Sequence, residues 1–209
     1  HGSPGGSEST GSAESQVLIS EILAHTDSPL IDAIELHNSG SQPVNVGGWR
    51  LTESASSLLG FRIPDGTVIP PGGYLVFDET DFNPNGLWNP NAGSRGPNEF
   101  ALSGARGGDI WLIRADASGN LLSFADHVEF GASFNGVSFG RWPNGSNNKL
   151  YPMQERSLFD EPSSTYPPTK RGGPNPSPRR AEVMVSEIMY NPPSANVDLE
   201  FIELYNSGE

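Results

Sequence analysis

The chain has 209 residues, of which 34% are hydrophobic, and it carries a formal net charge of −13. This length accommodates one or two domains, each with a core of ordinary size. The acidic balance disfavours DNA or RNA as a partner, because nucleic-acid binding depends on clustered Lys and Arg. The sequence contains no cysteine, which excludes disulfides, cysteine metal sites and thiol catalysis.

Glycine and proline, with 25 and 19 residues, lie between short apolar runs. This pattern is typical of turns between the strands of an all-β protein. No apolar run reaches the roughly 20 residues of a transmembrane helix, and no signal peptide is visible in this sequence. Residues 1–15 are rich in Gly and Ser and are predicted to form a flexible linker.

Predicted strands begin at residue 17. Residues 17–23 form an apolar run, and residues 32–37 alternate, with Ile34 and Leu36 facing the core and the face that carries Ala33, Glu35 and His37 predicted to point outward. The remaining predicted strands are residues 44–46, 49–52, 61–64, 68–69, 74–77, 100–102, 109–115, 121–124, 127–130 and 137–139. Strands this short and closely spaced indicate a sandwich or a barrel.

Two longer stretches lie outside this strand pattern. Residues 78–97 are rich in Asn, Pro and Gly and are predicted to form an excursion from the sheet. Residues 144–178 contain few apolar anchors and are predicted to close the domain and then become a linker. No convincing amphipathic helix is found anywhere in the sequence.

The first two predicted strands recur at the end of the chain. Ser-Glu-Ile occurs at 20–22 and 186–188, Ile-Glu-Leu at 34–36 and 202–204, and Asn-Ser-Gly at 38–40 and 206–208. The spacing between the two copies corresponds to a whole domain rather than to a short repeat. We therefore expect a domain at 16–172, a Pro- and Arg-rich linker at 173–182, and the truncated start of a second domain at 183–209.

Two strands alone are marginally stable in water. Residues 183–209 are therefore expected either to pair with an exposed sheet edge, their own or that of a neighbouring molecule, or to be disordered in solution.

Several motifs together resemble bacterial lamin tail domains. They are VLISEIL at 17–23, IELHNSG at 34–40, VNVGGWRL at 44–51, IPPGGYLVF at 69–77, GGDIWLI at 107–113 and GNLL at 119–122. FGRWPNG at 139–145 resembles their G-R-x-P-D-G element. Gly172-Gly173-Pro174-Asn175 resembles their closing P-G-x-P-N, with Gly172 in place of Pro. The resemblance covers residues 17–175 and the second, shorter copy.

The resemblance implies an all-β, immunoglobulin-like antiparallel β-sandwich with few or no helices. It also implies a non-catalytic module for spacing, adhesion or docking in an exported, multidomain bacterial protein at the cell surface or outside the cell. The expected partners are other domains of the same parent chain or surface proteins. The alternative is a calcium- or carbohydrate-binding accessory domain of a secreted hydrolase.

Residues 136–140 fit G-x-S-x-G, the nucleophile elbow of α/β-hydrolases, with Ser138 at its centre. That motif needs a strand followed by a helix, and Pro143 with the Asn-Gly that follows it prevents a helix here. Asp126 and His127 are adjacent, so on a strand their side chains would point to opposite faces. We therefore predict a strand serine, no catalytic residues and no enzyme activity.

Asp81, Asn83 and Asn85 fit the front half of a calcium-binding loop, D-x-N-x-N-G. Alternate residues of such a loop can supply the hard oxygen ligands that calcium prefers. The twelfth position of the loop is Ala92 instead of the usual glutamate, and Asn-Pro-Asn-Gly is also ordinary turn chemistry. Both interpretations stay open, with calcium as the candidate cofactor.

Glu21 and Glu35 recur in the second copy as Glu187 and Glu203. If the first two strands are antiparallel neighbours, the two carboxylates lie close together and require an arginine, backbone N–H groups or a cation as partners. Structural hydrogen bonding, a metal contact and paired-carboxylate catalysis are the three interpretations, and structural bonding is favoured.

Trp49 and Trp111 are predicted to pack in the core. Trp88, in the predicted excursion, is the best candidate for an exposed aromatic side chain that contacts carbohydrate. The internal histidines lack i, i+4 or H-x-H spacing, which argues against a zinc site.

Overall fold

The computed structural model describes residues 16–88, 95–116, 118–144, 149–158, 172–180, 182–192 and 199–206. The chain divides into two compact units, His1–Pro178 and Arg179–Glu209. The regular secondary structure of the described residues is β strand apart from two very short helices, so the predicted fold class is confirmed. Among these residues, no helix is both long and apolar enough to cross a lipid bilayer.

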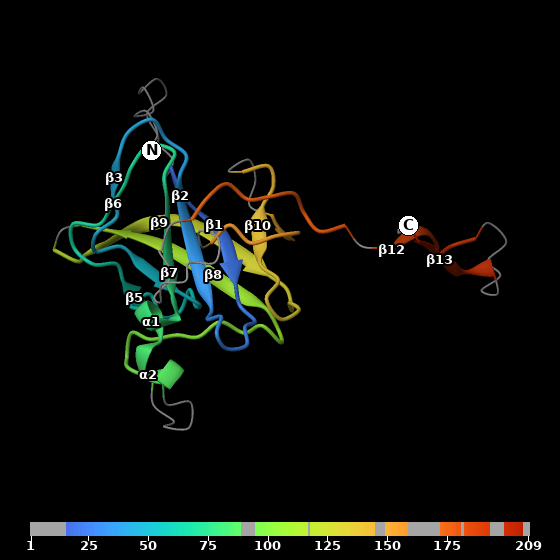
Figure 1. The fold of residues 1–209 in the computed structure, drawn as a ribbon, viewed down its shortest axis with the longest axis horizontal. Coiled ribbons are helices and arrows are strands. Elements are labelled where there is room, and N and C mark those ends of the chain that lie inside the picture. The colour runs from blue at the N-terminus through green and yellow to red at the C-terminus, as the bar shows by residue number, and fades with distance from the viewer. Residues whose placement is uncertain are drawn as a thin grey trace, which may run out of the picture. The chain divides into compact units, whose positions relative to one another are not determined.

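One sheet of the first unit has five antiparallel strands in the order β11-β10-β1-β2-β7 (Figure 1). The two central strands are the first two that the sequence predicts, and β2 pairs with both β1 and β7. The bounds are β1 Val17–Leu23, β2 Ala33–Asn38, β7 Tyr74–Asp78, β10 Phe139–Arg141 and β11 Leu150–Pro152.

The second sheet has four antiparallel strands in the order β5-β4-β8-β9, and a separate two-stranded ladder joins β3 to β6. The strands predicted at 121–124 and 127–130 form one continuous strand, β9. Its pairing with β8 contains two register shifts, between Leu112 and Ile113 and between Arg114 and Ala115, and these bulges allow the strand to continue. The bounds are β3 Val44–Asn45, β4 Arg50–Thr52, β5 Phe61–Arg62, β6 Val68–Ile69, β8 Gly108–Ala115 and β9 Leu121–Phe130.

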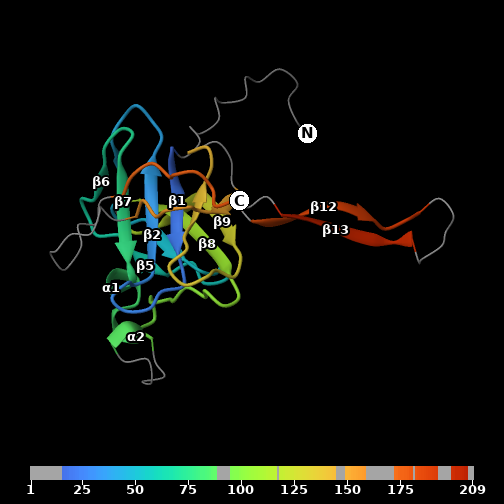
Figure 2. The ribbon, with the colours of Figure 1, turned by 45° about the vertical axis from the view of Figure 1, so that its right-hand side comes forward.

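The two larger sheets lie face to face, as Figure 2 shows for the strands around β1 and β8. The core between them contains Ile19 and Ile34 from the first sheet and Ile110, Leu112 and Val128 from the second. Burial of such side chains is the main favourable term in the folding of the domain. This packing of two antiparallel sheets is the predicted immunoglobulin-like sandwich.

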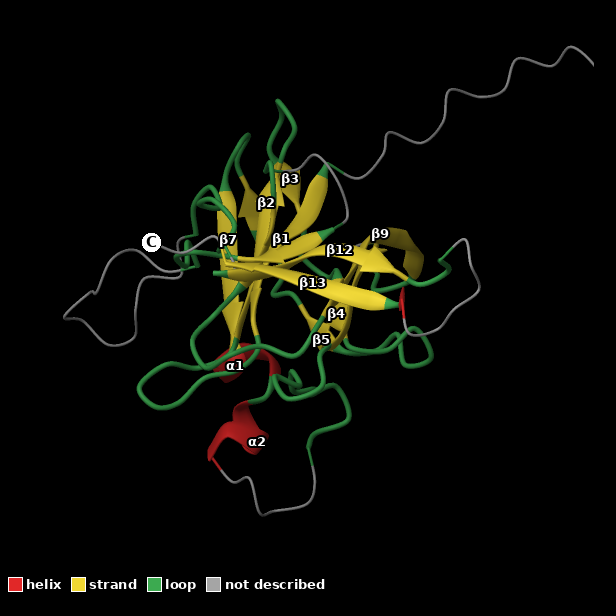
Figure 3. Ribbon diagram, turned by 90° about the vertical axis from the view of Figure 1, so that its right-hand side faces the viewer, coloured by secondary structure: helices red, strands yellow, loops and turns green. Residues whose placement is uncertain are grey.

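Two short helices, α1 Glu79–Phe82 and α2 Pro84–Trp88, follow β7 at one end of the sandwich (Figure 3, red). They lie in the stretch predicted as an irregular excursion. Asp78 caps α1: its side chain accepts the N–H of Thr80, and the Asp81 carboxylate accepts the Asp78 N–H. Residues 100–102, predicted as a strand, are irregular. The Phe100 N–H donates to the carbonyl of Phe82 at the end of α1 instead of to a neighbouring strand, and the two phenyl rings stack.

The prediction of an outward face on β2 was wrong for Ala33 and Glu35, which are both fully buried. Ala33 packs with Leu23, Val76 and Leu158 in a second apolar cluster on the other side of the five-stranded sheet. The first sheet is therefore covered on both faces: by the second sheet on one side and by the C-terminal part of the unit on the other.

The second unit is a two-stranded antiparallel hairpin of β12 (Val183–Met189) and β13 (Phe201–Asn206). Its register repeats that of β1 and β2, since Glu187 faces Glu203 as Glu21 faces Glu35. Each hairpin also has a register shift at the residue before the first glutamate. The repeat in the sequence is therefore also a repeat in strand pairing.

Candidate functional site

The central polar site of the first unit is a pair of buried glutamates on adjacent strands. Glu21 of β1 and Glu35 of β2 are directly opposite one another, and both side chains are fully buried. Two carboxylates in this position repel each other and have lost their water, so their partners determine whether the pair can exist.

Glu21 is held by two serines. The hydroxyl of Ser138, just before β10, donates to one carboxylate oxygen. The other oxygen accepts both the hydroxyl and the backbone N–H of Ser157, the latter at 3.0 Å. Of the expected partners, a backbone N–H group contacts Glu21 directly, and two serine hydroxyls, which the sequence did not suggest, supply the other hydrogen bonds.

Glu35 is held by the end of the unit. The backbone N–H of Gly173 donates to its Oε2 at 2.9 Å. The Oε1 atom is buried with no hydrogen-bond partner among the described residues. Glu35 is therefore the less well satisfied member of the pair.

Asn175 fixes the same C-terminal stretch to the sheet. Its side-chain amide donates to the backbone carbonyls of Ser20 and Arg141, each at 3.0 Å, and thereby bridges β1 and β10. The residue is buried, and its backbone N–H donates to Asn144. We refer to residues 172–178 as the closing segment. Residues 173–178 fall within the expected linker 173–182, yet they belong to the first unit, where Gly173 and Asn175 bond the five-stranded sheet.

Burial raises the pKa of both glutamates above the ordinary value. For Glu21, hydrogen bonds from Ser138 and Ser157 offset part of this effect. For Glu35, the neighbouring carboxyl of Glu21 raises the pKa further, and the rise is large. The pair therefore favours protonation in the folded state, as closely spaced, desolvated carboxyl groups do.

We expect the domain to be more stable at about pH 5 than at about pH 7.5. Burial raises the folded-state pKa of Glu21 and Glu35, and it raises that of Asp32 from 3.8 to about 6. The folded state then binds more protons than the unfolded chain. The resulting stability is fully present below the unfolded pKa values and is lost as the pH rises through the folded ones.

The substitution Glu35→Gln should flatten this profile and raise the free energy of unfolding at about pH 7.5 by about 1–2 kcal/mol, because it removes a poorly satisfied buried charge and keeps an acceptor for Gly173. Urea denaturation at both pH values measures the effect. Glu53→Gln, at an exposed position after β4, is the matched control. A Glu35→Gln profile as steep as that of the unchanged chain would contradict the assignment.

A buried ion pair joins β10 of the first sheet to β9 of the second. Arg141 donates to both carboxylate oxygens of Asp126, at 2.8 and 2.7 Å, and both side chains are almost completely shielded from solvent. The pair also hydrogen-bonds the backbone of Ile19. The Ile19 N–H donates to the Asp126 carboxylate, and the Ile19 carbonyl accepts the Nε–H of Arg141. β10 pairs with β1 only at Glu21 and Ile22, so these side chains replace strand pairing at Ile19.

These contacts also show how Ser138 of the G-x-S-x-G motif at 136–140 is used in the fold. Ser138 is buried and donates to Glu21, and Asp126 is engaged with Arg141. His127 points to the other face of β9, where its ring stacks on Trp111. The structure therefore keeps these serine, aspartate and histidine side chains apart. Asp126 and His127 point to opposite faces of their strand, as the sequence predicts.

The three candidate calcium ligands engage three different partners. Asp81 accepts the N–H of Asp78, Asn83 donates to Glu79, and Asn85 donates to Glu99. They belong to α1, α2 and the residue between them rather than to a curled loop. Calcium binding by Asp81, Asn83 and Asn85 stays a prediction, as does a metal contact at Glu21 and Glu35.

Of the two tryptophans predicted for the core, Trp49 is buried there. The prediction for Trp111 was wrong: it is only half-buried and packs against the rings of His127 and Phe124. The Trp88 side chain lies outside the described residues, so its contact with carbohydrate stays a prediction.

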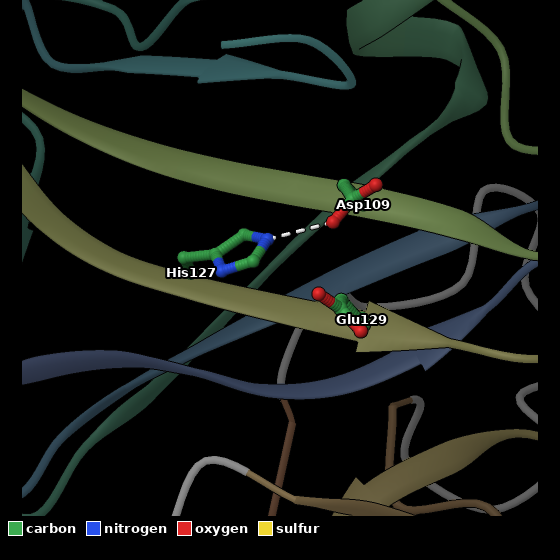
Figure 4. A group of neighbouring side chains, drawn as sticks. All are labelled: Asp109, His127 and Glu129. Atoms are coloured by element: carbon green, nitrogen blue, oxygen red, sulfur yellow. Dashed lines mark hydrogen bonds and ion pairs between the residues drawn. The ribbon is translucent and has the colours of Figure 1, made fainter.

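A second cluster, absent from the sequence analysis, joins Asp109 of β8 with His127 and Glu129 of β9 (Figure 4). One possible ligand atom from each residue lies within 4.8 Å of the others. The histidine Nε2 is 2.7 Å from an oxygen of Asp109. The spacing of histidines could not predict this cluster, because two of its three members are carboxylates. The sequence pattern that could have indicated it is the placement of His127 and Glu129 two residues apart, on one face of a predicted strand.

The fold and the buried polar site define an immunoglobulin-like β-sandwich domain that is closed by its own C-terminal segment. The family model described as Lamin Tail Domain matches residues 10–131, more than half of the chain. The chain belongs to the lamin tail domain family, as its motifs predict. Neither the curated proteins nor the solved structures gave a match to it.

Proposed function

We propose that this chain is a non-catalytic structural and interaction module, serving as a spacer, adhesion or docking domain of an exported multidomain protein. Membership of an immunoglobulin-like family that is generally non-catalytic supports the first part of this proposal. The family and the sandwich fold also support interaction with other proteins.

The observation that carries the proposal is that the buried carboxylates and the buried serine hydroxyl form structural hydrogen bonds. Glu21, Glu35 and Ser138 are the residues that could suggest hydrolytic chemistry, and their hydrogen bonds hold the closing segment and β10 to the sheet. Both carboxylates are fully buried. Carboxylates in glycoside hydrolysis must reach a substrate and a water molecule, so this arrangement favours a structural role.

The docking part of the proposal comes from the β12–β13 hairpin. One of its faces is aliphatic, and these side chains are 53–66% exposed. The corresponding side chains of β1 and β2 are completely buried in the core of the first unit. The exposed set is Val183, Val185, Ile188, Ile202 and Leu204, and the buried set is Val17, Ile19, Ile22, Ile34 and Leu36.

Among the described strands, β12 and β13 form a sheet of their own. An exposed two-stranded hairpin with an apolar face is a template for pairing with another sheet. We propose that β12–β13 becomes ordered by such pairing. Its charge and sequence pattern favour a β-sheet partner over nucleic acid, because its strands carry glutamates and no Lys or Arg.

Amide hydrogen exchange combined with sedimentation velocity on the full chain tests this proposal. We expect protection of the β12 and β13 amides that Leu204→Lys reduces severalfold, because lysine places a charge on the docking face. Tyr205→Lys, next in sequence on the opposite face, is the matched control and should retain protection. Absence of protection in the unchanged chain would rule out docking through this hairpin.

A further inference from the structure

The outer face of the second sheet carries a cluster with the composition of a metal site. Asp109 lies on β8, and His127 and Glu129 lie two residues apart on β9, so the latter two share a strand face. Asp109 and Glu129 are cross-strand partners, and His127 faces Trp111 two pairs further along, on the same face of the sheet. The pleat and the register thus bring three potential ligands to one point of the surface.

The geometry leaves this point accessible. The side chains of His127 and Asp109 are 30% and 46% exposed, and Glu129 is exposed as well. Figure 4 shows both carboxyl groups near the side of the imidazole ring that carries Nε2. An ion arriving from solvent could contact all three residues and keep open positions for water.

The imidazole ring is fixed before any ion arrives. It stacks on the indole of Trp111 with ring centroids 3.7 Å apart and an angle of 18° between the ring planes. Phe124 packs against the same indole, with ring centroids 5.1 Å apart. A ligand held in position loses less conformational entropy on binding than a freely rotating one.

The charges favour a cation. Like charges directly opposite on neighbouring strands destabilise a sheet, and the Asp109–Glu129 pair is such an arrangement. The hydrogen bond of His127 to Asp109 engages only one of the two carboxylates. Glu129 makes no side-chain hydrogen bond or ion pair within the described part of the chain. A divalent ion would neutralise both carboxylates.

We propose that Asp109, His127 and Glu129 bind one divalent first-row transition-metal ion, with Zn²⁺ as the representative member. Imidazole nitrogen and carboxylate oxygen are ligands of Zn²⁺, and three protein ligands with water in the remaining position form a recognised arrangement. The histidine also selects against calcium and magnesium, which prefer oxygen ligands alone. The site is separate from the buried glutamates and does not depend on the proposed function.

Isothermal titration of the full chain with Zn²⁺ in a non-coordinating buffer near neutral pH tests the proposal. We expect saturable binding of one ion, lost in His127→Gln and at least about tenfold weaker in Glu129→Gln. His37→Gln is the matched control, because His37 also lies on a strand, is half-buried and stacks on an aromatic ring, that of Tyr74. This variant should bind as the unchanged chain does.

Co²⁺ absorption provides a readout that a purely structural histidine would not affect. Visible d–d bands should appear with the unchanged chain and with His37→Gln and be absent with His127→Gln. Glu129→Gln alters an exposed side chain and so tests the site without threatening the fold. The proposal is overturned if the unchanged chain shows no saturable binding, or if His127→Gln and Glu129→Gln bind both ions as well as it does.

Discussion

Arg141→Met is expected to lower the free energy of unfolding by about 3–5 kcal/mol, the loss typical of breaking a buried ion pair by removing one partner. Methionine retains much of the side-chain volume but leaves the Asp126 carboxylate buried without its bidentate partner. It also leaves the Ile19 carbonyl without its donor, at a point where no strand pairs with that edge of β1. Urea denaturation measures the change.

Two further variants separate these contributions. Arg62→Met breaks an exposed ion pair with Asp65 of similar length and should have a far smaller effect, because solvent screens that pair. The double variant Asp126→Leu with Arg141→Met removes both charges and should recover part of the loss, although Ile19 keeps its unsatisfied backbone groups. If Arg141→Met were no more destabilising than Arg62→Met, the ion pair could not have the structural role assigned to it.

Gly172→Ala is expected to destabilise the domain by about 3 kcal/mol, at the upper end for an overpacked site. A Cβ atom on Gly172 would lie 1.6 Å from Oε2 and 2.5 Å from the carboxyl carbon of Glu35. The Glu35 side chain is fully buried, so it cannot yield easily. The closing segment must therefore move away, and the hydrogen bond from Gly173 is lost with it.

Thermal or urea denaturation together with limited proteolysis across residues 172–178 tests this expectation. Gly131→Ala is the matched control, because a Cβ atom at Gly131 meets no atom within 4 Å. Both glycines lie outside the positive-φ region, so the comparison isolates the steric effect. Equal stability and equal protease resistance of the two variants would contradict the packing described for the closing segment.

The sequence predicted the parts of the fold that depend on local pattern. The repeat of 17–40 at 183–209 located β1 and β2, and the alternation around Ile34 and Leu36 identified the face that packs in the core. Periodicity and turn residues act over a few positions, which is why most strand positions were predicted correctly.

The contacts that cover the other face of β2 could not be predicted in this way. Glu35 and Gly173 are 138 positions apart, and neither residue alone indicates the other. The sequence did indicate that the glutamates need partners, and the structure supplies serine hydroxyls and backbone N–H groups. The start of α1 was predictable in principle, because Asp78 and Asp81 have the spacing of a capping box.

The closing segment also determines how the first unit would carry mechanical load. The chain enters the sandwich at β1 and leaves it after Pro178, which forms a bridge with Met153, and the carbonyl of Ser177 accepts the N–H of Gln154. The Asn175 side chain, just before these residues, is bonded to the backbone of β1 and β10. Tension between these two points acts first on the contacts of Ser177 and Pro178 with Gln154 and Met153, and next on the bonds of Asn175 and the bond of Gly173 to Glu35. A few polar contacts of the closing segment thus act as the mechanical clamp of the domain, and the hydrophobic core is loaded only after they break.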